Sequence, residues 1–483
     1  MKTLATLILS GILLVIASSD APRASPGAGP RMLLSWAGGS RSEANRSSEQ
    51  APFPHHTEPY VVDTRAQESL AVEGGVAFRQ VVRSPGAAWL RLHFGDYDLG
   101  ERNTITITSL QDGGQQRLDA KSLPKWQNAT ALFNGDAVEV ALHAAPGETG
   151  IFFRLEEITV GEPGGRDIGQ GAPEAPESQC GPTDDRTAST DPAVGRIMPV
   201  GCTGWIVSNG ANLTAGHCVG ASMQVLQFNV PASLSNGTPV NPPPQDQYPI
   251  EPMANIDWFD DGNGAIGNDW AVFETFENSN TGRLAVHVQG AFYRMSRDDN
   301  PANVRVTGYG LDFVPAGPGG GPAYCPTCNA NSQTLQTHSG AYLGETVQGA
   351  SDVFIEYTVD TEGGNSGSPV ISTANGVTLG IHTNGGCNPP STGNTGTGFE
   401  HDNLESAIQT FPGATVRYVD NGHPVATEDG TVFRPYDTFI GGVTAAPSGA
   451  ILSLVRGTYD EATPLVITKA LLIEAPVGAV TIR

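Results

Sequence analysis

A serine placed between glycines offers the clearest chemistry in this chain. Residues 363–369 read Gly-Gly-Asn-Ser-Gly-Ser-Pro, with Ser366 at the centre. Glycines allow the backbone to turn sharply enough to present a hydroxyl and to aim amide groups at one point. A serine hydroxyl is a weak nucleophile at neutral pH, so it needs a base and a group that orients the base. The segment therefore predicts a serine nucleophile if both partners occur elsewhere.

Both partners stand upstream of Ser366. His217 lies in Leu-Thr-Ala-Gly-His-Cys (213–218), after an apolar run, 204–207, that is typical of a strand. Asp269 begins Asp-Trp-Ala-Val-Phe (269–273), a carboxylate at the start of an apolar strand. Asp257 is a rival for the acid, although its flanks indicate a loop rather than a strand. The predicted order is His, Asp, Ser.

The three segments Thr-Ala-Gly-His-Cys, Asn-Asp-Trp-Ala-Val and Gly-Asn-Ser-Gly-Ser-Pro, in this order, resemble the trypsin/chymotrypsin superfamily of serine proteases. The resemblance covers residues 186–411 and implies a double β-barrel. It also implies that Ser366 attacks the scissile carbonyl, that His217 moves the proton and that Asp269 orients the imidazole. The amides of Gly364 and Ser366 would form the oxyanion hole.

Residues 380–386, Gly-Ile-His-Thr-Asn-Gly-Gly, resemble the bacterial glutamyl-endopeptidase-like branch of that superfamily. The resemblance implies that His382 and Thr361 line the specificity pocket and hydrogen-bond a substrate carboxylate, most strongly when the ring is protonated. This favours cleavage after Glu. The residues Thr383, Asn384 and Gly385 would form the strand that pairs with the substrate backbone.

Two residues near the nucleophile bear on specificity and activation. Asp360 stands six residues before Ser366, where trypsin-like enzymes keep an aspartate that binds Arg or Lys, so the sign of the pocket stays open. Trypsin-like zymogens also carry Asp directly before the serine, where it binds the newly cut N-terminus. This chain has Asn365, which cannot form that ion pair. Activation by the trypsin route is therefore not expected.

Composition and charge indicate an exported protein with several domains. The 483 residues exceed what one hydrophobic core usually organises. Residues 1–20 have the pattern of a signal peptide, a basic residue followed by a short apolar run, and no later stretch predicts a membrane span. The net charge of −24 argues against nucleic acid and anionic membranes as partners. Protein or peptide substrates are expected, with no cofactor and no metal.

The six cysteines favour disulfides over zinc in an exported chain. Cys202 and Cys218 can staple a strand to the histidine loop. The remaining four allow three complete pairings that the sequence does not rank: Cys180, Cys325, Cys328 and Cys387. The pattern Cys-Pro-Thr-Cys (325–328) is a weaker indication of a redox or zinc motif, because it lacks a second such pair.

The chain is predicted to be all-β, with a sandwich-like domain before the protease barrels and a small β-rich module after them. Alternating apolar residues separated by Gly/Asp turns predict the sandwich. The last segment resembles the opening coils of a parallel β-helix, and its ligand is unknown. A short helix starting at Asp402 would close the protease domain. The expected divisions are a signal peptide (1–20), a tether or pro-segment (21–66), the sandwich-like domain (67–162), a linker (163–185), the protease domain (186–411) and the β-rich module (416–483).

Three functions from different classes are compatible with these features. The first is an exported serine endopeptidase, the second a catalytically silent protein with a protease fold that binds its targets, and the third a surface adhesion protein. The presence of Ser366, His217 and Asp269 favours the first.

Overall fold

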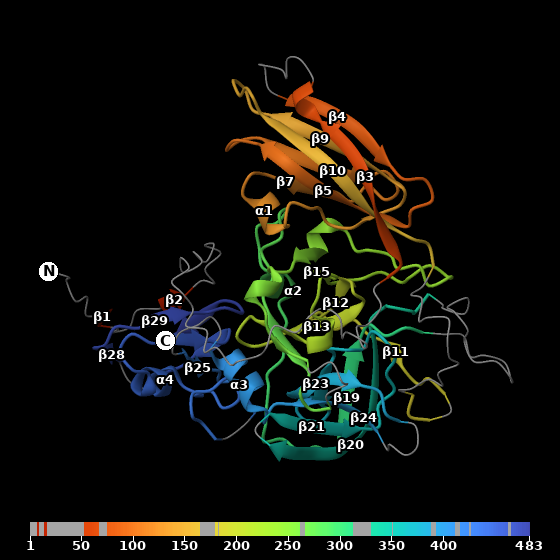
Figure 1. The fold of residues 1–483 in the computed structure, drawn as a ribbon. Helices are drawn as coiled ribbons and strands as arrows, with labels where there is room; N and C mark the ends of the chain where they lie inside the picture. The colour runs from red at the N-terminus through yellow and green to blue at the C-terminus, as the bar shows by residue number, and fades with distance from the viewer. Residues whose placement is uncertain are drawn as a thin grey trace.

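The structure is a computed structural model, and it describes residues 7–8, 14–16, 53–66, 75–164, 179–181, 183–260, 266–312, 330–349, 351–387, 393–410, 416–424, 427–461 and 465–483. Within these ranges the protein consists of β-sheets with a few short helices, as the sequence predicts. The sheets form a sandwich, a pair of barrels and a parallel stack (Figure 1). No helix in the described part of the chain has the length and apolarity needed to cross a membrane.

The N-terminal part is a sandwich of two antiparallel four-stranded sheets. Its strands alternate between inward and outward side chains, so Ile105 and Ile107 are fully buried while their neighbours are not. Trp89 and Trp126 fill the space between the sheets with α1 (Ser122–Lys125). The first sheet has the order β3 (His55–Asp63), β10 (Phe152–Gly161), β5 (Trp89–Asp98) and β8 (Phe133–Asn134), and the second β4 (Gly75–Arg83), β9 (Ala137–Ala144), β6 (Thr104–Ser109) and β7 (Gln115–Leu118).

The sandwich begins earlier than the sequence predicts. Residues 55–63, which we expected in the tether, form β3 and pair with β10 along its length. β3 is an edge strand with few buried side chains, so its apolar signal is weak. Phe53 is buried just before it, and its amide donates to the carbonyl of Pro199 at 2.9 Å. Residues 64–66 continue β3 as a 3-10 turn, and residues 21–52 of the expected tether lie outside the described ranges.

The first barrel is a seven-stranded antiparallel sheet that curls back on itself. An isolated bridge between Ile250 and Thr275 joins its two sides. Cys202 and Ile206 belong to its core and have no exposed surface or nearly none. Trp205 and Leu213 face another core, which also contains Phe399. The strand order is β16 (Gln247–Pro249), β15 (Met223–Gln227), β12 (Val194–Pro199), β13 (Cys202–Ile206), β14 (Asn212–Thr214), β18 (Trp270–Phe273) and β17 (Asp257–Phe259).

The second barrel closes through direct pairing of β20 with β21. The two barrels lie one above the other in Figure 1, and the nucleophile loop belongs to the second. This is the double barrel that the sequence predicts. The strand order is β11 (Thr187–Ala188), β20 (Gln336–Gly349), β19 (Asn303–Gly308), β22 (Pro369–Ser372), β23 (Thr378–Asn384), β24 (Asn394–Gly398) and β21 (Asp352–Tyr357).

Two helices accompany the barrels, α2 (Ala285–Gln289) and α3 (Asp402–Gln409). We expected Asp402 to cap α3, but the cap is one residue earlier, where the His401 side chain accepts from the Leu404 amide. Asp402 instead lies in the first turn, where its charge suits the helix dipole.

The C-terminal module is a parallel stack of short strands. β25 (Val416–Val419), β26 (Ile451–Leu454) and β29 (Leu472–Glu474) pair in register on one side, and β27 (Gly457–Tyr459) pairs with β30 (Val480–Ile482) on the other. Parallel pairing of successive coils is the arrangement of a β-helix, as the sequence predicts. α4 (Phe439–Ala445) covers it, and the short strands β1 (Leu7–Ile8) and β2 (Leu14–Ile16) pair with β28 (Val466–Ile467) and β30.

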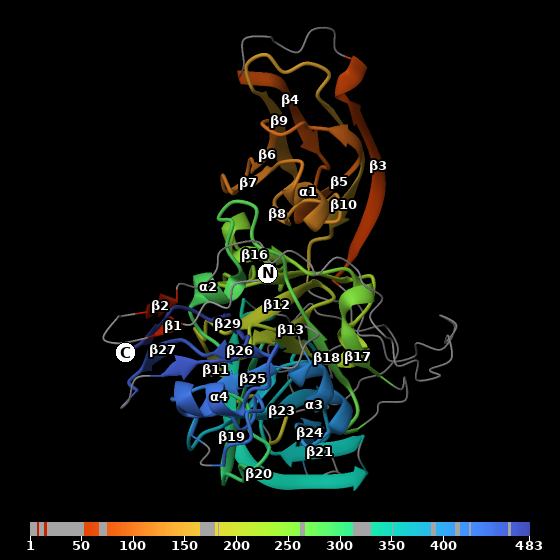
Figure 2. The ribbon, with the colours of Figure 1, turned by 90° about the vertical axis from the view of Figure 1, so that its left-hand side faces the viewer.

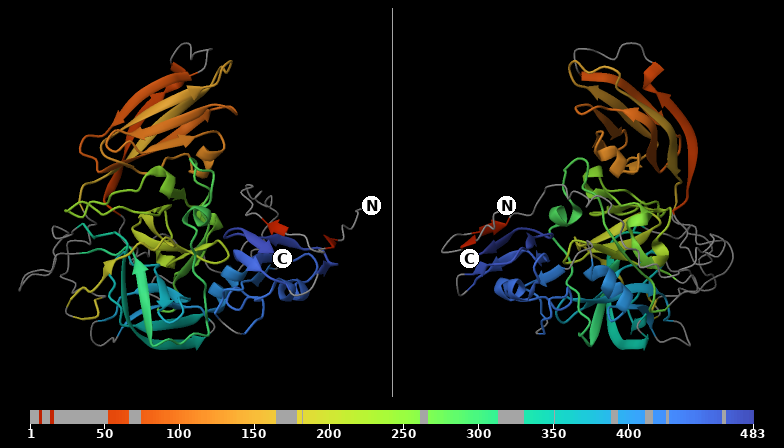
Figure 3. Two further views of the ribbon diagram at one scale, coloured as in Figure 1. Left: turned by 180° about the vertical axis from the view of Figure 1, so that it is seen from behind. Right: turned by 60° about the vertical axis from the view of Figure 1, so that its left-hand side comes forward.

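The sandwich and the parallel stack both pack against the barrels, on different sides (Figures 2 and 3). Met198 and Val225 of the first barrel belong to the core of the sandwich. Gln247 exchanges hydrogen bonds of 3.0 and 2.9 Å with the backbone of Leu132. On the other side, Arg294 pairs with Asp420 of the stack. The barrels are therefore held between two accessory parts.

Candidate active site

His217 lies in a single 3-10 turn, Gly216–Cys218, that follows β14. A disulfide joins Cys218 to Cys202 at the start of β13, so the turn is tied covalently to the barrel. Gly216 leaves no room for a side chain, because a Cβ there would come within 1.9 Å of the carbonyl oxygen of Phe259. The imidazole is thus placed by a disulfide and by tight backbone packing.

Asp269 contacts His217 at two points. Its Oδ2 is 2.6 Å from Nδ1 of the imidazole, and its Oδ1 accepts from the His217 backbone amide at 3.0 Å. The Asp269 side chain is 5% exposed. The Thr397 hydroxyl accepts from the Asp269 amide and donates to the Asp269 carbonyl. A carboxylate at Nδ1 fixes the tautomer in which Nε2 accepts a proton. Asp257, the rival in the sequence, lies exposed on β17.

The loop that carries Ser366 is held by β13. The Thr203 amide donates to the Ser366 carbonyl at 2.9 Å, and the Thr203 hydroxyl donates to the Gly364 carbonyl at 2.9 Å. Gly364 and Gly367 have φ of +106° and +90°, a conformation that favours glycine. A Cβ at Gly367 would lie 3.0 Å from the amide nitrogen of Ala215, two residues before His217. The serine loop and the histidine turn are therefore in direct contact.

The Ser366 side chain is partly exposed at this junction. Its Oγ makes no hydrogen bond within the described part of the chain, and its backbone amide is likewise opposite no acceptor there. Hydrogen bonds between nucleophile and base are often loose without substrate and tighten when it binds. An amide with no internal acceptor is available to a developing oxyanion.

His382 is buried beside this junction on β23. Its Nδ1 is 2.7 Å from the hydroxyl of Tyr357, and its backbone carbonyl accepts from the Gly367 amide at 2.8 Å. Burial lowers the pKa of His382 to about 3, and a positive charge on His217 acts in the same direction. The ring is therefore neutral at physiological pH. We expected the ring to bind a carboxylate most strongly when protonated, and this form is not populated near neutral pH.

Thr361 and Thr383 each make a hydrogen bond with an asparagine side chain. The Thr361 hydroxyl accepts from the Asn394 side chain at 3.0 Å and keeps its own hydrogen to donate. The Thr383 hydroxyl donates to the Asn384 side chain at 2.7 Å. Asn384 and Gly385 are more exposed than His382.

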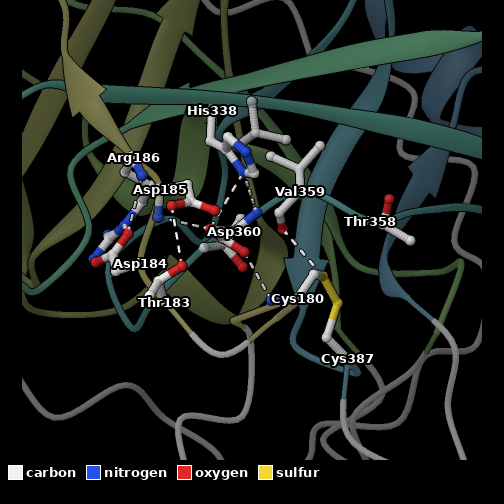
Figure 4. A network of polar contacts seen from close by, with 12 residues as sticks. Cys180, Thr183, Asp184, Asp185, Arg186, His338, Thr358, Val359, Asp360 and Cys387 are labelled. Carbon is white, nitrogen blue, oxygen red and sulfur yellow. Dashed lines mark hydrogen bonds and ion pairs between the residues drawn. A yellow bond between two sulfur atoms is a disulfide. The ribbon is translucent and has the colours of Figure 1, made fainter. Parts of the chain in front are cut away.

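Asp360 directs its carboxylate to backbone amides. Oδ1 accepts from the Cys180 amide at 2.7 Å, and Oδ2 accepts from the Asp185 amide at 2.9 Å. The Asp360 amide in turn donates to Nδ1 of His338 at 2.8 Å. Figure 4 shows this carboxylate facing Cys180 and Asp185. Cys180 forms a disulfide with Cys387, one of the pairings left open by the sequence; Cys325 and Cys328 lie outside the described residues.

Two groups of described residues have the spacing of metal ligands. In Cys202, His217 and Cys218 the sulfurs form a disulfide and the imidazole meets Asp269. In the group Asp185, His338 and Asp360, the donor atoms of His338 and Asp360 already accept hydrogen bonds from backbone amides. Neither group offers a metal a set of uncommitted donors.

Several residues that shape the site carry no local sequence signal. Tyr357 orients His382, and Asn394 orients Thr361. Arg186, the first residue of the protease domain that we expected, reaches the nucleophile loop. Each of these side chains acts across the fold, on a residue far away in sequence, so no motif marks it.

The comparisons with known proteins agree with the protease fold. A family model described as a trypsin-like peptidase domain matches residues 202–381. This segment runs from the disulfide at β13 to the residue before His382 and contains His217, Asp269 and Ser366. A comparison with curated proteins gave no match.

Several solved protease structures are similar to part of the chain at low identity. The chain is similar to the thermostable serine protease AL20 from an extremophilic microorganism, with 15% identity, 44% of this chain and 96% of that chain covered, and a TM-score of 0.30. It is similar to the scabies mite inactivated protease paralogue S-I1, with 16% identity, coverage of 47% and 99%, and a TM-score of 0.32. It is also similar to neuropsin, a serine protease expressed in the limbic system of mouse brain, with 13% identity. The match covers 46% of this chain and 95% of that chain, with a TM-score of 0.31.

Proposed function

We propose that this protein is a serine endopeptidase in which Ser366, His217 and Asp269 form the catalytic triad. The contact between the His217 imidazole and the Asp269 carboxylate, at 2.6 Å, is the observation that carries this proposal. Ser366 Oγ adds to the scissile carbonyl carbon while His217 takes its proton and then gives it to the leaving amine. Water repeats the cycle on the acyl-enzyme and regenerates the serine.

The oxyanion hole in this proposal is formed by the amides of Gly364 and Ser366. The Gly363 carbonyl shares a peptide plane with the Gly364 amide and accepts from the Leu311 amide at 2.9 Å. The Asn365 carbonyl shares a plane with the Ser366 amide and accepts from the Ser368 amide at 2.9 Å, so both planes are fixed. Fixed donors stabilise the tetrahedral intermediate because they need no reorganisation during the reaction.

We further propose that the primary specificity pocket accepts Glu before the scissile bond. The Asp360 carboxylate, which would favour Arg or Lys, is engaged with the amides of Cys180 and Asp185. If the Tyr357 hydroxyl donates to Nδ1 of His382 over their 2.7 Å contact, Nε2 carries the ring hydrogen. Nε2–H and the Thr361 hydroxyl are then two neutral donors for a substrate carboxylate. Thr383, Asn384 and Gly385 would pair with the substrate backbone.

Export fits this activity. Two disulfides, Cys202–Cys218 and Cys180–Cys387, are stable in an oxidising compartment, and residues 1–20 have the pattern of a signal peptide. The substrates would then be proteins or peptides outside the cytoplasm. The domain divisions given above remain our proposal, with the sandwich beginning at β3.

Hydrolysis by purified full-length protein and by two serine variants tests the triad. Ser366→Ala should abolish cleavage of a peptide library. Ser372→Ala is the matched control, because this buried serine lies on the strand after the loop and its Oγ has no hydrogen-bond partner in the described part of the chain. Full activity of Ser366→Ala would overturn the assignment of the nucleophile. No activity in the unmodified protein would favour a silent binding protein or an adhesion protein.

A further inference from the structure

The segment 180–186, directly before the barrels, is fixed to the loop that carries the proposed nucleophile. Its first residue, Cys180, is joined to Cys387 by a disulfide and donates its amide to Asp360. Five residues later the Asp185 amide donates to the other oxygen of the same carboxylate. Figure 4 shows these contacts from close by. We call the described residues 180–181 and 183–186 the strap.

The strap ends in a buried cation. Arg186 has a side chain that is 2% exposed, and its guanidinium pairs with Asp184 through Nε at 2.9 Å and Nη2 at 2.5 Å. Burial lowers the pKa of Arg186, but the hydrogen bond and charge of Asp184 together with the charges of Glu362 and Asp312 raise it above its ordinary value. The positive charge is therefore permanent in this site.

From this position the guanidinium reaches the nucleophile loop by two routes. Nη2 donates to the Leu311 carbonyl at 2.7 Å, and the Leu311 amide donates to the Gly363 carbonyl at 2.9 Å. Nη1 lies 3.5 Å from Oδ1 of Asn365, the residue before Ser366. That same Oδ1 accepts from the Glu362 amide at 3.0 Å. The guanidinium thus contacts the turn directly at Asn365 and indirectly at Gly363, through Leu311.

Arg186 and Asn365 are tightly packed against Gly310. A Cβ at Gly310 would lie 2.2 Å from Asn365 Oδ1 and 2.3 Å from Arg186 Nη1. Only glycine at 310 allows the guanidinium and the amide to share this space. A displacement of the guanidinium would therefore be transmitted to Asn365 rather than absorbed by a cavity.

The charges explain why a neutral side chain stands at 365. Asp184, Glu362 and Asp312 all act on the single positive charge of Arg186. Three carboxylates already exceed one cation, so a fourth at position 365 would add repulsion in a buried site. An amide can still accept from the Glu362 backbone and from Arg186 without adding charge.

We propose that Arg186 is a positioning residue that sets the oxyanion-hole turn, and that the strap lets the intact chain do this without a newly cut N-terminus. This inference rests on the proposed protease function. It assigns activation to an internal cation that the disulfide and the Asp360 carboxylate hold in place. The active form is then one continuous chain from the sandwich into the barrels.

Kinetics of full-length variants test the role of Arg186. Arg186→Ala should lower kcat about 10²-fold with little change in KM, because the oxyanion turn is misplaced while the substrate pocket stays. Guanidinium ion at millimolar concentration should restore part of kcat. Arg294→Gln removes another Arg–Asp pair far from the loop, on the side of the parallel stack, and should keep kcat and show no response to guanidinium.

If Arg186→Ala does not fold, the same kinetics are measured on the Arg186→Lys variant. One ammonium cannot hold Asp184, Leu311 and Asn365 together, so kcat should fall by roughly 10-fold at similar melting temperature. If the unmodified protein is active and the Arg186 variant that folds has unchanged kcat and KM, the role of Arg186 is overturned. The proposed protease function would still stand. If the unmodified protein cleaves no peptide, the proposed function fails first and this inference fails with it.

The state of the chain gives an independent readout. After labelling with a fluorophosphonate probe and reduction of disulfides, the labelled species should have the mass of a chain that is uncut between residues 163 and 185. Labelling that appears only after cleavage in this range would show that a new N-terminus is required, and would overturn the proposal.

Discussion

The carboxylate of Asp269 contacts His217 twice, once at the ring and once at the backbone. Oδ2 is 2.6 Å from Nδ1 and Oδ1 is 3.0 Å from the backbone nitrogen. Two contacts fix both the tautomer of the imidazole and the position of its turn. A substitution that keeps the shape of Asp269 but not its charge therefore separates these two effects.

Asp269→Asn should lower kcat by roughly 10⁴-fold, the loss that this change causes in other Ser-His-Asp triads through the wrong histidine tautomer. The amide can still meet the His217 backbone, so the melting temperature should change little. Steady-state hydrolysis and thermal unfolding measure the two quantities. Asp257→Asn, on the exposed strand β17, is the control and should keep full activity. The reverse pattern would assign the acid to Asp257.

Preference for Glu should not depend on the protonation of His382. Burial lowers the pKa of the His382 ring to about 3. The ring is therefore neutral throughout pH 6–9 and becomes protonated only near pH 3. The ratio of kcat/KM for matched Glu and Gln peptides should therefore stay constant over this range. A rise in the ratio as pH falls from 8 to 6 would mean that a protonated ring binds the substrate.

The hydroxyl of Tyr357 should matter for that preference. Tyr357→Phe removes the 2.7 Å contact to Nδ1 of His382, which leaves the ring orientation and tautomer unset. We expect the Glu/Gln ratio to fall by about 5-fold, corresponding to one hydrogen bond of about 1 kcal/mol. Equal ratios in the variant and the unmodified protein would remove His382 from substrate recognition. A shift of preference to Arg or Lys would instead implicate Asp360.

Glu362 should make the protein less stable as pH rises. Burial raises the pKa of Glu362 to about 7, with Arg186 opposing and Asp184 adding to the rise. The folded state then binds a proton more tightly than the unfolded state, whose ordinary value is 4.5. The free energy of unfolding therefore falls as pH rises from 4.5 to 7. Above pH 7 it falls no further on account of Glu362.

Glu362→Gln tests this directly. The variant should match the unmodified protein at pH 4 and be more stable at pH 8, by at most about 3 kcal/mol. Denaturant unfolding at both pH values measures the difference. Glu157→Gln, at an exposed position on β10, is the control and should show no such change. A Glu362→Gln variant that is less stable at pH 8 would mean that the carboxylate contributes favourably to the fold.

The residues of the proposed triad could be predicted from the sequence because each lies in a short local motif. His217 and Asp269 follow or begin apolar strands, and Ser366 lies between glycines. The strands of the sandwich and the barrels could be predicted for a similar reason, since alternation of apolar residues is a local pattern. β3 was missed because it is an edge strand with a weak pattern, next to residues of low complexity.

The contacts around the nucleophile loop could not be predicted because they join distant parts of the chain. The direction of the Asp360 carboxylate depends on amides at positions 180 and 185. The neutrality of His382 depends on its burial next to Tyr357. Spacing in the sequence does not encode burial or the side on which a carboxylate finds its donors.

The tight packing at Gly310 gives a test that leaves all charges in place. Gly310→Ala should push Asn365 and Arg186 apart, since its Cβ would meet both within 2.3 Å. We expect a loss of stability of about 1–3 kcal/mol and a lower kcat with KM little changed. Gly349→Ala, where a Cβ meets nothing within 4 Å, should change neither. Normal kcat in Gly310→Ala would mean that the turn tolerates the displacement.

The most direct test of the account is the site of covalent modification by a fluorophosphonate probe. The probe phosphonylates only a serine that is activated by its base, with loss of fluoride. Peptide mapping of the labelled full-length protein should place one adduct on Ser366, and His217→Ala should prevent it while Asp257→Asn should not. An adduct on another residue, or no adduct in correctly folded protein, would contradict the assignment of Ser366 as the nucleophile.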